Sequence, residues 1–216
     1  MKDVFLPLHA EPRQRRHPKQ LRSRLMVETI VEAAGQVFME SDFEAASTNQ
    51  IAERAGISIG SLYQYFPNKD ALILAVQKQH HDEVLKVVRT TMERTRELPL
   101  QDAIREIIGA NLDMHLKQRR LHAAIEAWIP AHSKLVDRAG FQEEMAGTVM
   151  TFLSQKPEVP QGAHLQTAVF VIMNMVKSVM HAAVQDCNTV PNRDQIVDRL
   201  TVGILGCLAE QSGERL

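Results

Sequence analysis

The chain has 216 residues, of which 44% are hydrophobic, so it can bury a sizeable core as one large domain or two small ones. Its formal net charge of −1 excludes a nucleic-acid interaction driven by the charge of the whole chain, and any such interaction must depend on local charge. No stretch approaches about 18 consecutive apolar residues, and the initial segment MKDVFLPLHAEP is too short and interrupted for a secretory signal. We therefore expect a cytoplasmic protein without a membrane partner.

Positive charge is concentrated near the N-terminus. The segment from Pro12 to Arg24 has no acidic residue and carries the basic residues Arg13, Arg15, Arg16, Lys19, Arg22 and Arg24. We expect residues 1–18 to form a basic, flexible arm. Its arginines at 13, 15 and 16 are candidate DNA contacts, because an arm ahead of a first helix can reach a neighbouring groove. The alternative is a solvated head that has no partner.

Helical periodicity runs through the rest of the chain, and no segment has the alternation of a strand. Apolar residues recur at three-and-four spacing from about Lys19 to Ser41, which predicts a long first helix. Proline and glycine then separate further predicted helices, at residues 68–96, 100–117, 120–129, 134–154, 162–186 and 192–210. The sequence thus predicts an all-α fold.

The segment from 47 to 66, STNQIAERAGISIGSLYQYF, predicts two short helices joined by a tight turn. Ser47 and Gln50 have the spacing of a capping box, in which the side chain of each bonds the other's backbone amide. Gly56 supplies the turn, and Ser58 is placed to cap the second helix. A pair of short helices crossing at a steep angle is a helix-turn-helix, whose second helix enters the major groove of DNA.

The second short helix has a polar side. Leu62 anchors it, so the candidate DNA-contacting positions face outward: Ile59, Gly60, Ser61, Tyr63 and Gln64. Tyr65 is either a further contact or a core aromatic. Pro67 ends the helix, and Asn68 caps the next one, which leaves Lys69 in a first turn that already favours a phosphate.

Residues 25 to 72 resemble the DNA-binding domain of the TetR family of transcriptional regulators. The matching stretches, in order and without a gap, are IVEAAGQVF, FEAAS, IAERAGIS, GSLYQYF and PNKDAL. The resemblance implies that Ser47 and Ser58 cap helices near phosphates, and that Tyr65 and Lys69 contact the DNA backbone. Asp42 departs from the family pattern, which usually has glycine there. Ile59 and Gln64 stand where the family often has basic or imidazole side chains.

The resemblance also implies an organisation and a function. We expect a DNA-binding domain at residues 19–67, followed at 68–216 by a helical domain that binds an effector and dimerises. The expected function is a homodimeric repressor that a small, mostly hydrophobic effector releases from a palindromic operator. Activators also occur in the family. Its members dimerise through their last two helices, and here Leu200, Ile204 and Leu208 form an apolar stripe in the last helix.

The apolar helix predicted at 162–186 has one polar stripe, so it can line a pocket, face a partner or face water. Bulky or polar side chains here and in the preceding helices are candidate ligand-binding residues: Trp128, Phe141, Met145, Phe152, Phe170, Asn174, Met175 and Lys177. A stripe rich in methionine is also common in ordinary core packing.

Sequence motifs for catalysis or metal binding are missing. The nine histidines are scattered without the HExxH spacing of zinc proteases, and Cys187 and Cys207 lack the spacing of a metal knuckle. We therefore expect no metal, no cofactor and no enzyme activity. Two other classes stay open, namely a helical enzyme whose first 70 residues only pack against the rest, and a non-specific architectural DNA binder.

Overall fold

The computed structural model describes residues 18–41, 44–128, 138–185 and 192–209, and the regular structure in these ranges is entirely α-helical. The helices are α1 (Pro18–Glu40), α2 (Thr48–Arg54), α3 (Ile59–Tyr65), α4 (Lys69–Arg94), α5 (Leu100–Lys117), α6 (Arg119–Trp128), α7 (Arg138–Ser154), α8 (Ala163–Gln185) and α9 (Arg193–Leu208). The prediction of an all-α fold is confirmed. The predicted helix boundaries agree within a few residues, except that the predicted start of α7 lies outside the described residues.

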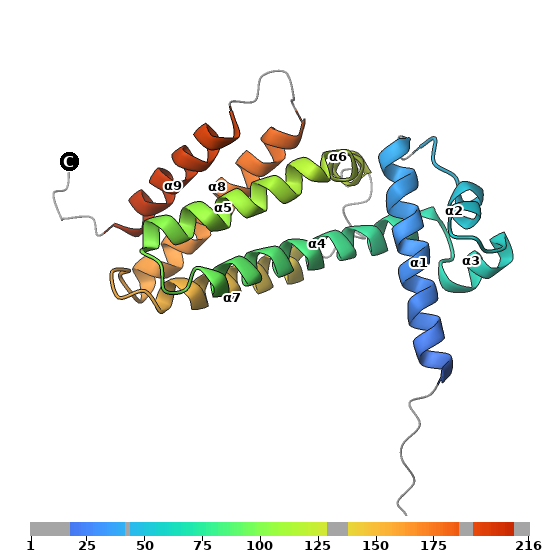
Figure 1. Cartoon of the computed structure of the whole chain (residues 1–216), viewed down its shortest axis with the longest axis horizontal. Helices are drawn as coiled ribbons and strands as arrows, with labels where there is room; N and C mark the ends of the chain where they lie inside the picture. The colour runs from blue at the N-terminus through green and yellow to red at the C-terminus, as the bar shows by residue number, and fades with distance from the viewer. Residues whose placement is uncertain (1–17, 42–43, 129–137, 186–191, 210–216) are drawn as a thin grey trace, which may run out of the picture.

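The first three helices form a small unit at one end of the molecule, together with the start of α4 and with α6 (Figure 1). Its core contains Ile30 and Phe38 from α1, Ile51 from α2 and Leu62 from α3, all at most 2% exposed. Helix α1 packs against α2, α4 and α6, so the short helices are held on one side of a long one.

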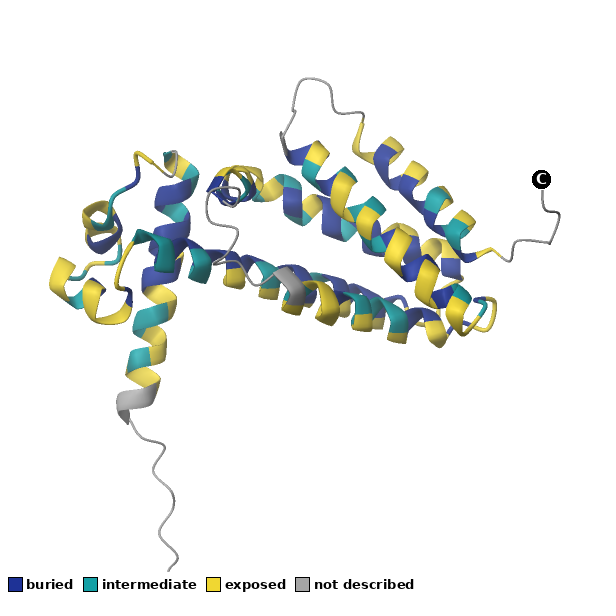
Figure 2. Cartoon of the chain, turned by 180° about the vertical axis from the view of Figure 1, so that it is seen from behind, coloured by how far each residue is buried: buried dark blue, intermediate teal, exposed yellow. Residues whose placement is uncertain are grey.

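The remaining helices form a bundle with a separate apolar core. Helix α5 packs against α4, α8 and α9, and α7 packs against α4 and α8. Figure 2 shows buried positions where these helices face one another and exposed positions along their outer sides. The stripe Leu200, Ile204 and Leu208 of α9 is buried in this core, each residue being 4% exposed. This stripe faces the inside of the chain and is not available to a second copy, because α9 packs its apolar side onto α5 and α8.

Two helices belong to both cores. Helix α4 has 26 residues, about 39 Å at 1.5 Å per residue, and extends from the N-terminal unit along the bundle (Figure 1). Its Ile73 and Val76 are in the first core, whereas Val84 and Val88 are in the second. Helix α6 places its buried apolar residues in the first core and packs against α8 and α5 of the bundle. These helices are therefore the physical connection between the two units.

Among the described helices, α8 alone has the length and apolar character of a membrane span, with a mean hydropathy of 1.5 across Ala163–Val184. In the structure it packs against α5, α6, α7 and α9, and 33% of that window is buried.

Candidate functional site

The start of α2 has the local structure that its sequence predicts. The amide of Gln50 donates to Oγ of Ser47 at 3.3 Å, and the amide of Ser47 donates to Oε1 of Gln50 at 2.9 Å. This reciprocal capping box satisfies two amides that the helix itself leaves without a partner. Ile51 and Ala52 then turn into the core and fix α2 against α1.

A glycine turn leads from α2 to α3. Gly56 has φ of +68°, a left-handed conformation that other residues adopt only with strain. Its amide donates to the carbonyl of Glu53, and the next amide, of Ile57, donates to the carbonyl of Ala52. Ser58 then caps α3 by accepting from the amide of Ser61 at 3.1 Å. The helix-turn-helix is thus built from interactions between close neighbours in sequence.

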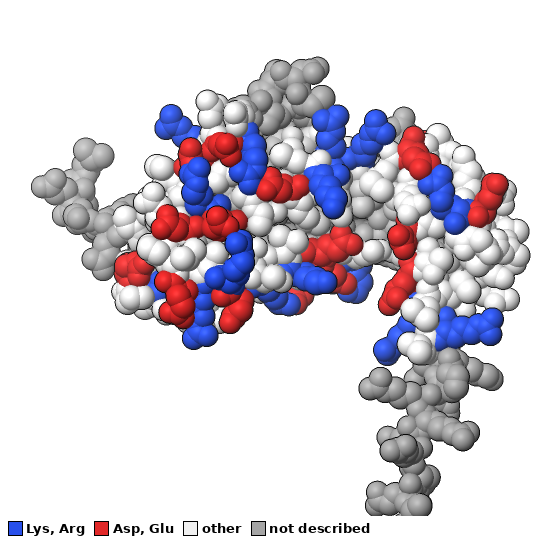
Figure 3. All heavy atoms as spheres, in the orientation of Figure 1, with Lys and Arg blue, Asp and Glu red and all other residues white. Residues whose placement is uncertain are grey.

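The outer face of α3 is polar and uncharged. Leu62 is its buried residue, whereas Tyr63 is 49% exposed and Ile59 37%. The hydroxyls of Tyr63 and Thr48 lie 3.1 Å apart and share a hydrogen bond, which holds the tyrosine ring beside the start of α2. Because α3 contains no Lys, Arg, Asp or Glu, the surface over it is white in Figure 3.

The other predicted DNA-binding positions have mixed surroundings. Gly60 and Gln64 are exposed, and Tyr65 is 36% exposed, so its ring is partly packed. Ser61 is partly buried, and its hydroxyl lies 2.8 Å from that of Ser58. The arginines at 13, 15 and 16 lie outside the described residues.

Lys69, at the start of α4, lies beside the segment that precedes α2. Its Nζ donates to the carbonyl of Ala46 at 3.2 Å and to that of Glu44 at 3.4 Å. Asn68 caps α4, as predicted, by accepting from the amide of Ala71 at 2.8 Å. Lys69 therefore joins α4 to the entry of the helix-turn-helix, a structural contact that sequence reasoning missed.

A cavity of about 180 Å³ lies within the bundle, lined mostly by apolar side chains of α4, α5, α6, α7, α8 and α9. Four of the eight predicted ligand-binding residues line it, namely Phe141, Met145, Phe152 and Lys177. They come from α7 and α8, which are adjacent in the fold.

The other four predicted ligand-binding residues lie elsewhere. Trp128 is buried in the N-terminal core, because α6 turns its apolar side toward α1. Phe170 is 70% exposed, since the inward side of α8 is formed by residues such as Val169 and Ile172. Asn174 shares the outward side and donates to the carbonyl of Phe170, and the sulfur of Met175 lies against Gly203 of α9.

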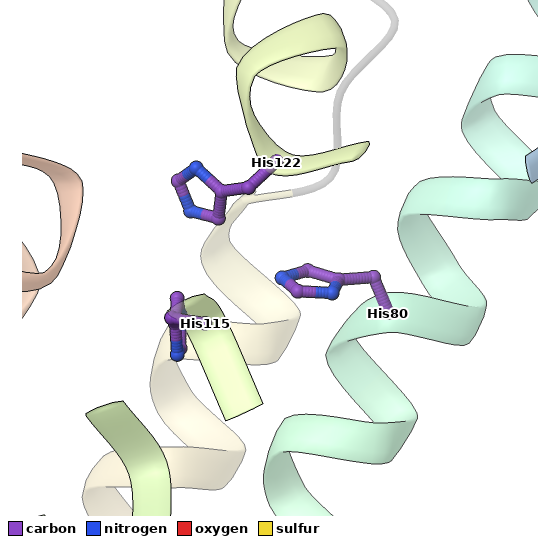
Figure 4. Close-up of side chains that lie close together, drawn as sticks. All are labelled: His80, His115 and His122. Carbon is purple, nitrogen blue, oxygen red and sulfur yellow. The ribbon is translucent and has the colours of Figure 1, made fainter. Parts of the chain in front are cut away.

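Histidines gather at the α6 end of this cavity. His80 of α4, His115 of α5 and His122 of α6 are each at most 7% exposed, and Figure 4 shows their rings directed toward a common space. The ring centroid of His80 lies 5.6 Å from the centroid of His115 and 5.6 Å from that of His122. The centroids of His115 and His122 are 5.3 Å apart. His81 and His181 line the same cavity.

Burial keeps these imidazoles neutral near pH 7. It lowers the pKa of His115 to about 4 and, together with the neighbouring histidines, lowers the pKa of His122 to about 3. The pKa of His80 is also lowered by burial, and the hydrogen bond that its Nδ1 donates to Gln118 acts in the opposite direction. Neutral imidazoles keep a nitrogen lone pair that can accept a proton or bind a metal ion.

The sequence by itself does not reveal this cluster, because its members come from three helices without a local ligand motif. His115 and His122 are seven residues apart, but α5 ends and α6 begins between them, so helical spacing does not relate them. The available signal was that histidine occurs at apolar-facing positions in three successive predicted helices.

The geometry defines a class of protein: a helix-turn-helix unit with an exposed, neutral recognition helix, connected by α4 and α6 to a bundle that contains a cavity. Two family profiles match the chain. The profile described as bacterial regulatory proteins, tetR family, covers residues 30–76, and that described as tetracyclin repressor-like, C-terminal domain, covers residues 99–208. The chain belongs to the TetR family of DNA-binding transcriptional regulators.

Curated relatives share part of the chain. The transcriptional activator FasR of Mycolicibacterium smegmatis is 33% identical over 96 residues, which are 44% of this chain and 35% of FasR. The regulator BetI of Escherichia coli is 32% identical over 113 residues, 50% of this chain and 52% of BetI. The chain thus spans about half or less of the length of these relatives.

Solved structures share the fold over most of the chain. A putative TetR-family regulator from Mesorhizobium loti has a TM-score of 0.72 at 17% identity, covering 87% of this chain and 96% of its own. The repressor AlkX from Dietzia has a TM-score of 0.60 at 21% identity, covering 84% and 94%. The fatty acid degradation regulator FadR from Bacillus halodurans has a TM-score of 0.58 at 17% identity, covering 83% and 97%.

Proposed function

We propose that this chain is a one-component regulator that represses transcription from a palindromic operator and is released by a small, mostly hydrophobic effector. The observation that carries the proposal is the exposed, uncharged face of α3, presented by a unit whose helices α4 and α6 extend to the cavity. As a DNA-binding protein it acts in the bacterial cytoplasm.

The DNA contacts are proposed to come from the outer side of α3 and the caps around it. Gly60 allows the backbone to approach DNA closely, and the hydroxyls of Ser61 and Tyr63 can bond phosphates or base edges. A face without charge reads the major groove while basic residues outside α3, including the N-terminal arm, supply the attraction to phosphate. Residues 19–67 are the proposed DNA-binding domain.

The proposed dimer interface is the outward side of α8 and α9. Phe170 is 70% exposed, Val171 43% and Val202 65%, so apolar surface is presented to solvent by both helices. A Cβ added at Gly206 of α9 has no atom within 4 Å, so the backbone there is open to a neighbouring helix. Pairing these faces in two copies would bury Phe170, and would present two α3 helices about 34–36 Å apart to successive major grooves.

The effector is proposed to bind in the bundle cavity. Its lining is mostly apolar, and Asn111, Gln142 and Lys177 provide polar or charged groups along it. Two regulators of similar fold are associated with hydrophobic compounds. AlkX is implicated in the biodegradation of n-alkanes, and FadR is a fatty acid degradation regulator. Residues 68–216 are the proposed effector-binding and dimerisation domain.

The affinity for DNA and the affinity for the effector are thermodynamically coupled. If DNA and effector favour different separations of the two α3 helices, each weakens the binding of the other by the same factor, typically about 5- to 150-fold. Since FasR is an activator, the sign of regulation is tested directly by a reporter gene placed behind the selected operator.

The experiment is selection of genomic fragments by the purified chain, followed by binding measurements across a range of salt concentrations. We expect enrichment of palindromic sites, a steep salt dependence and little competition from random DNA. Equal competition by random DNA would favour the architectural binder. Absence of DNA retention at low salt, together with turnover or a cofactor that survives purification, would favour the enzyme.

A further inference from the structure

We propose that His80, His115 and His122 form a binding site for one divalent transition-metal ion of the zinc type, at the α6 end of the cavity. Imidazole nitrogen suits Zn²⁺, Co²⁺, Ni²⁺ and Cu²⁺, whereas Mg²⁺ and Ca²⁺ require oxygen ligands. In proteins, zinc is often bound by three histidines, which leaves a fourth coordination position of the metal open.

The possible ligand atoms of the three histidines converge. One nitrogen from each of the three rings lies within 4.8 Å of the others. Around a tetrahedral zinc ion with bonds of about 2.0–2.1 Å, such nitrogens lie about 3.3 Å apart. The rings therefore need to close by at most about 1.5 Å, which side-chain rotation can supply.

Hydrogen bonds already fix the tautomers of two of the three histidines. The amide nitrogen of Gln118 donates to Glu83 at 2.7 Å, so the Gln118 oxygen accepts from Nδ1 of His80 at 2.9 Å. Nδ1 of His80 then carries the proton, and Nε2 keeps its lone pair for the common space.

His115 is fixed in the same way. Its Nδ1 lies 2.9 Å from the backbone carbonyl of Asn111, which can only accept, so Nδ1 donates and Nε2 carries the lone pair. A metal-binding histidine almost always donates its other nitrogen to a carbonyl, carboxylate or water, which orients the ring and fixes the tautomer. Both His80 and His115 have that second interaction in place.

The third histidine has a buried ring nitrogen without a hydrogen-bond partner among the described residues. His122 is 5% exposed, and its Nδ1 has no hydrogen-bond partner among the described residues. A buried polar atom without a partner destabilises the fold, because it has lost its hydrogen bonds to water. A metal ion bound at this nitrogen would satisfy it, and the rings of His80, His115 and His181 all lie near the His122 ring, with centroids 5.6, 5.3 and 4.8 Å away.

A second group shares His122 and adds Glu126 and His181. We assign the ion to the first group because all three of its rings are buried and two have fixed tautomers. In the second group, Nδ1 of His181 lies 3.5 Å from a Glu126 oxygen, so these two side chains already interact with each other.

The position of the site gives it a regulatory consequence, which rests on the proposed function. The three ligands come from α4, α5 and α6, so a bound ion joins the two connecting helices to the bundle. Beyond His122, Ile125 and Trp128 of α6 are in the core of the N-terminal unit. A bound ion would therefore hold α6 and α4 in one arrangement, and so favour one placement of the N-terminal unit relative to the bundle.

The test uses the full chain without a histidine tag, treated with a chelator and returned to metal-free buffer. Titration with Co²⁺ should saturate at one ion per chain with the visible absorption of four-coordinate cobalt, and Zn²⁺ should displace it. Zn²⁺ should also raise the midpoint of thermal unfolding, because it binds the folded state. Absence of both responses in the wild-type chain overturns the proposal.

Ligand variants locate the site. His80→Gln, His115→Gln and His122→Gln should each weaken Co²⁺ binding by at least about 10-fold. His164→Gln is the matched control, because Nε2 of His164 is also buried without a described partner but lies outside the cavity lining. Circular dichroism checks that each variant is folded. Binding that is lost in His181→Gln and Glu126→Gln but kept in His80→Gln and His115→Gln overturns the assignment.

The regulatory consequence is measured separately, as the affinity for a selected operator fragment with and without one equivalent of Zn²⁺. We expect a change of at least about 5-fold in the wild-type chain and none in His115→Gln. Metal binding without any change in DNA affinity overturns the regulatory consequence alone. Metal binding by a chain that selects no operator overturns the proposed function and leaves the site in place.

Discussion

The indole nitrogen of Trp128 donates a hydrogen bond of 3.1 Å to Oδ1 of Asp70, which joins the end of α6 to the first turn of α4. Trp128 is 3% exposed and packs in the N-terminal core. The two connecting helices are therefore tied to each other where they enter that core. A change in the cavity that moves either helix acts on this contact.

Asp70→Ala should lower the free energy of unfolding by about 1–3 kcal/mol, because it leaves the buried indole N–H without this acceptor. Asp70→Asn is the control, since its amide oxygen can still accept while the charge is lost. Urea unfolding measures both variants. Equal destabilisation by the two would mean that the charge of Asp70 in the first turn of α4 matters more than the hydrogen bond.

Gly56→Ala should destabilise the chain by about 1–2 kcal/mol, because alanine is strained at φ of +68°. A Cβ there meets no atom within 4 Å, so the cost is one of backbone conformation alone. Gly147→Ala is the matched control. It also has open space, but it lies inside α7, where alanine should stabilise by about 0.5–1 kcal/mol. The measurement is the midpoint of thermal unfolding. A shift of this midpoint in the same direction for both variants would contradict the prediction.

Tyr63→Ala should weaken operator binding by about 1–3 kcal/mol while leaving stability nearly unchanged, because the ring is exposed and its hydroxyl bonds only at the surface. Tyr63→Phe separates the contribution of the hydroxyl from that of the ring. Fluorescence anisotropy with a labelled operator is the measurement. Unchanged affinity in the alanine variant would remove Tyr63 from the interface.

Phe170→Glu should convert the proposed dimer to monomers, because it places a charge on the exposed apolar side of α8. Leu98→Glu is the control, since Leu98 is 42% exposed but lies in the connection between α4 and α5. Sedimentation velocity distinguishes the two masses. A Phe170→Glu chain that remains dimeric would move the interface to another face.

Acid should weaken the contact between α5 and α9. Hydrogen bonds of 2.6 and 2.7 Å from Arg193 lower the pKa of Asp113, so this pair stabilises the fold above the ordinary pKa of the carboxylate. That stability is lost as pH falls below the ordinary pKa of an aspartate, about 3.9, and through the lowered value. Because both side chains are exposed, the effect is about 0.2–1 kcal/mol. Asp113→Asn should flatten the pH dependence of unfolding in that window, and an identical profile would contradict it.

Much of the N-terminal unit was determined by the sequence alone. The capping box of Ser47 and Gln50, the left-handed turn at Gly56 and the caps at Ser58 and Asn68 were all predicted and are all present. Each depends on atoms within about four residues of one another, so the chain specifies them before any tertiary contact forms. Helical periodicity fixed the all-α class for the same reason.

The tertiary structure decided which side of each helix meets which neighbour. Phe141 and Phe152 line the cavity, whereas Trp128 packs toward α1 and Phe170 faces outward, although all four are aromatic residues in predicted helices. Composition cannot separate them, because the assignment depends on the rotation of a helix about its axis and on its packing angle. The histidine cluster has the same origin, since it exists only where α4, α5 and α6 cross.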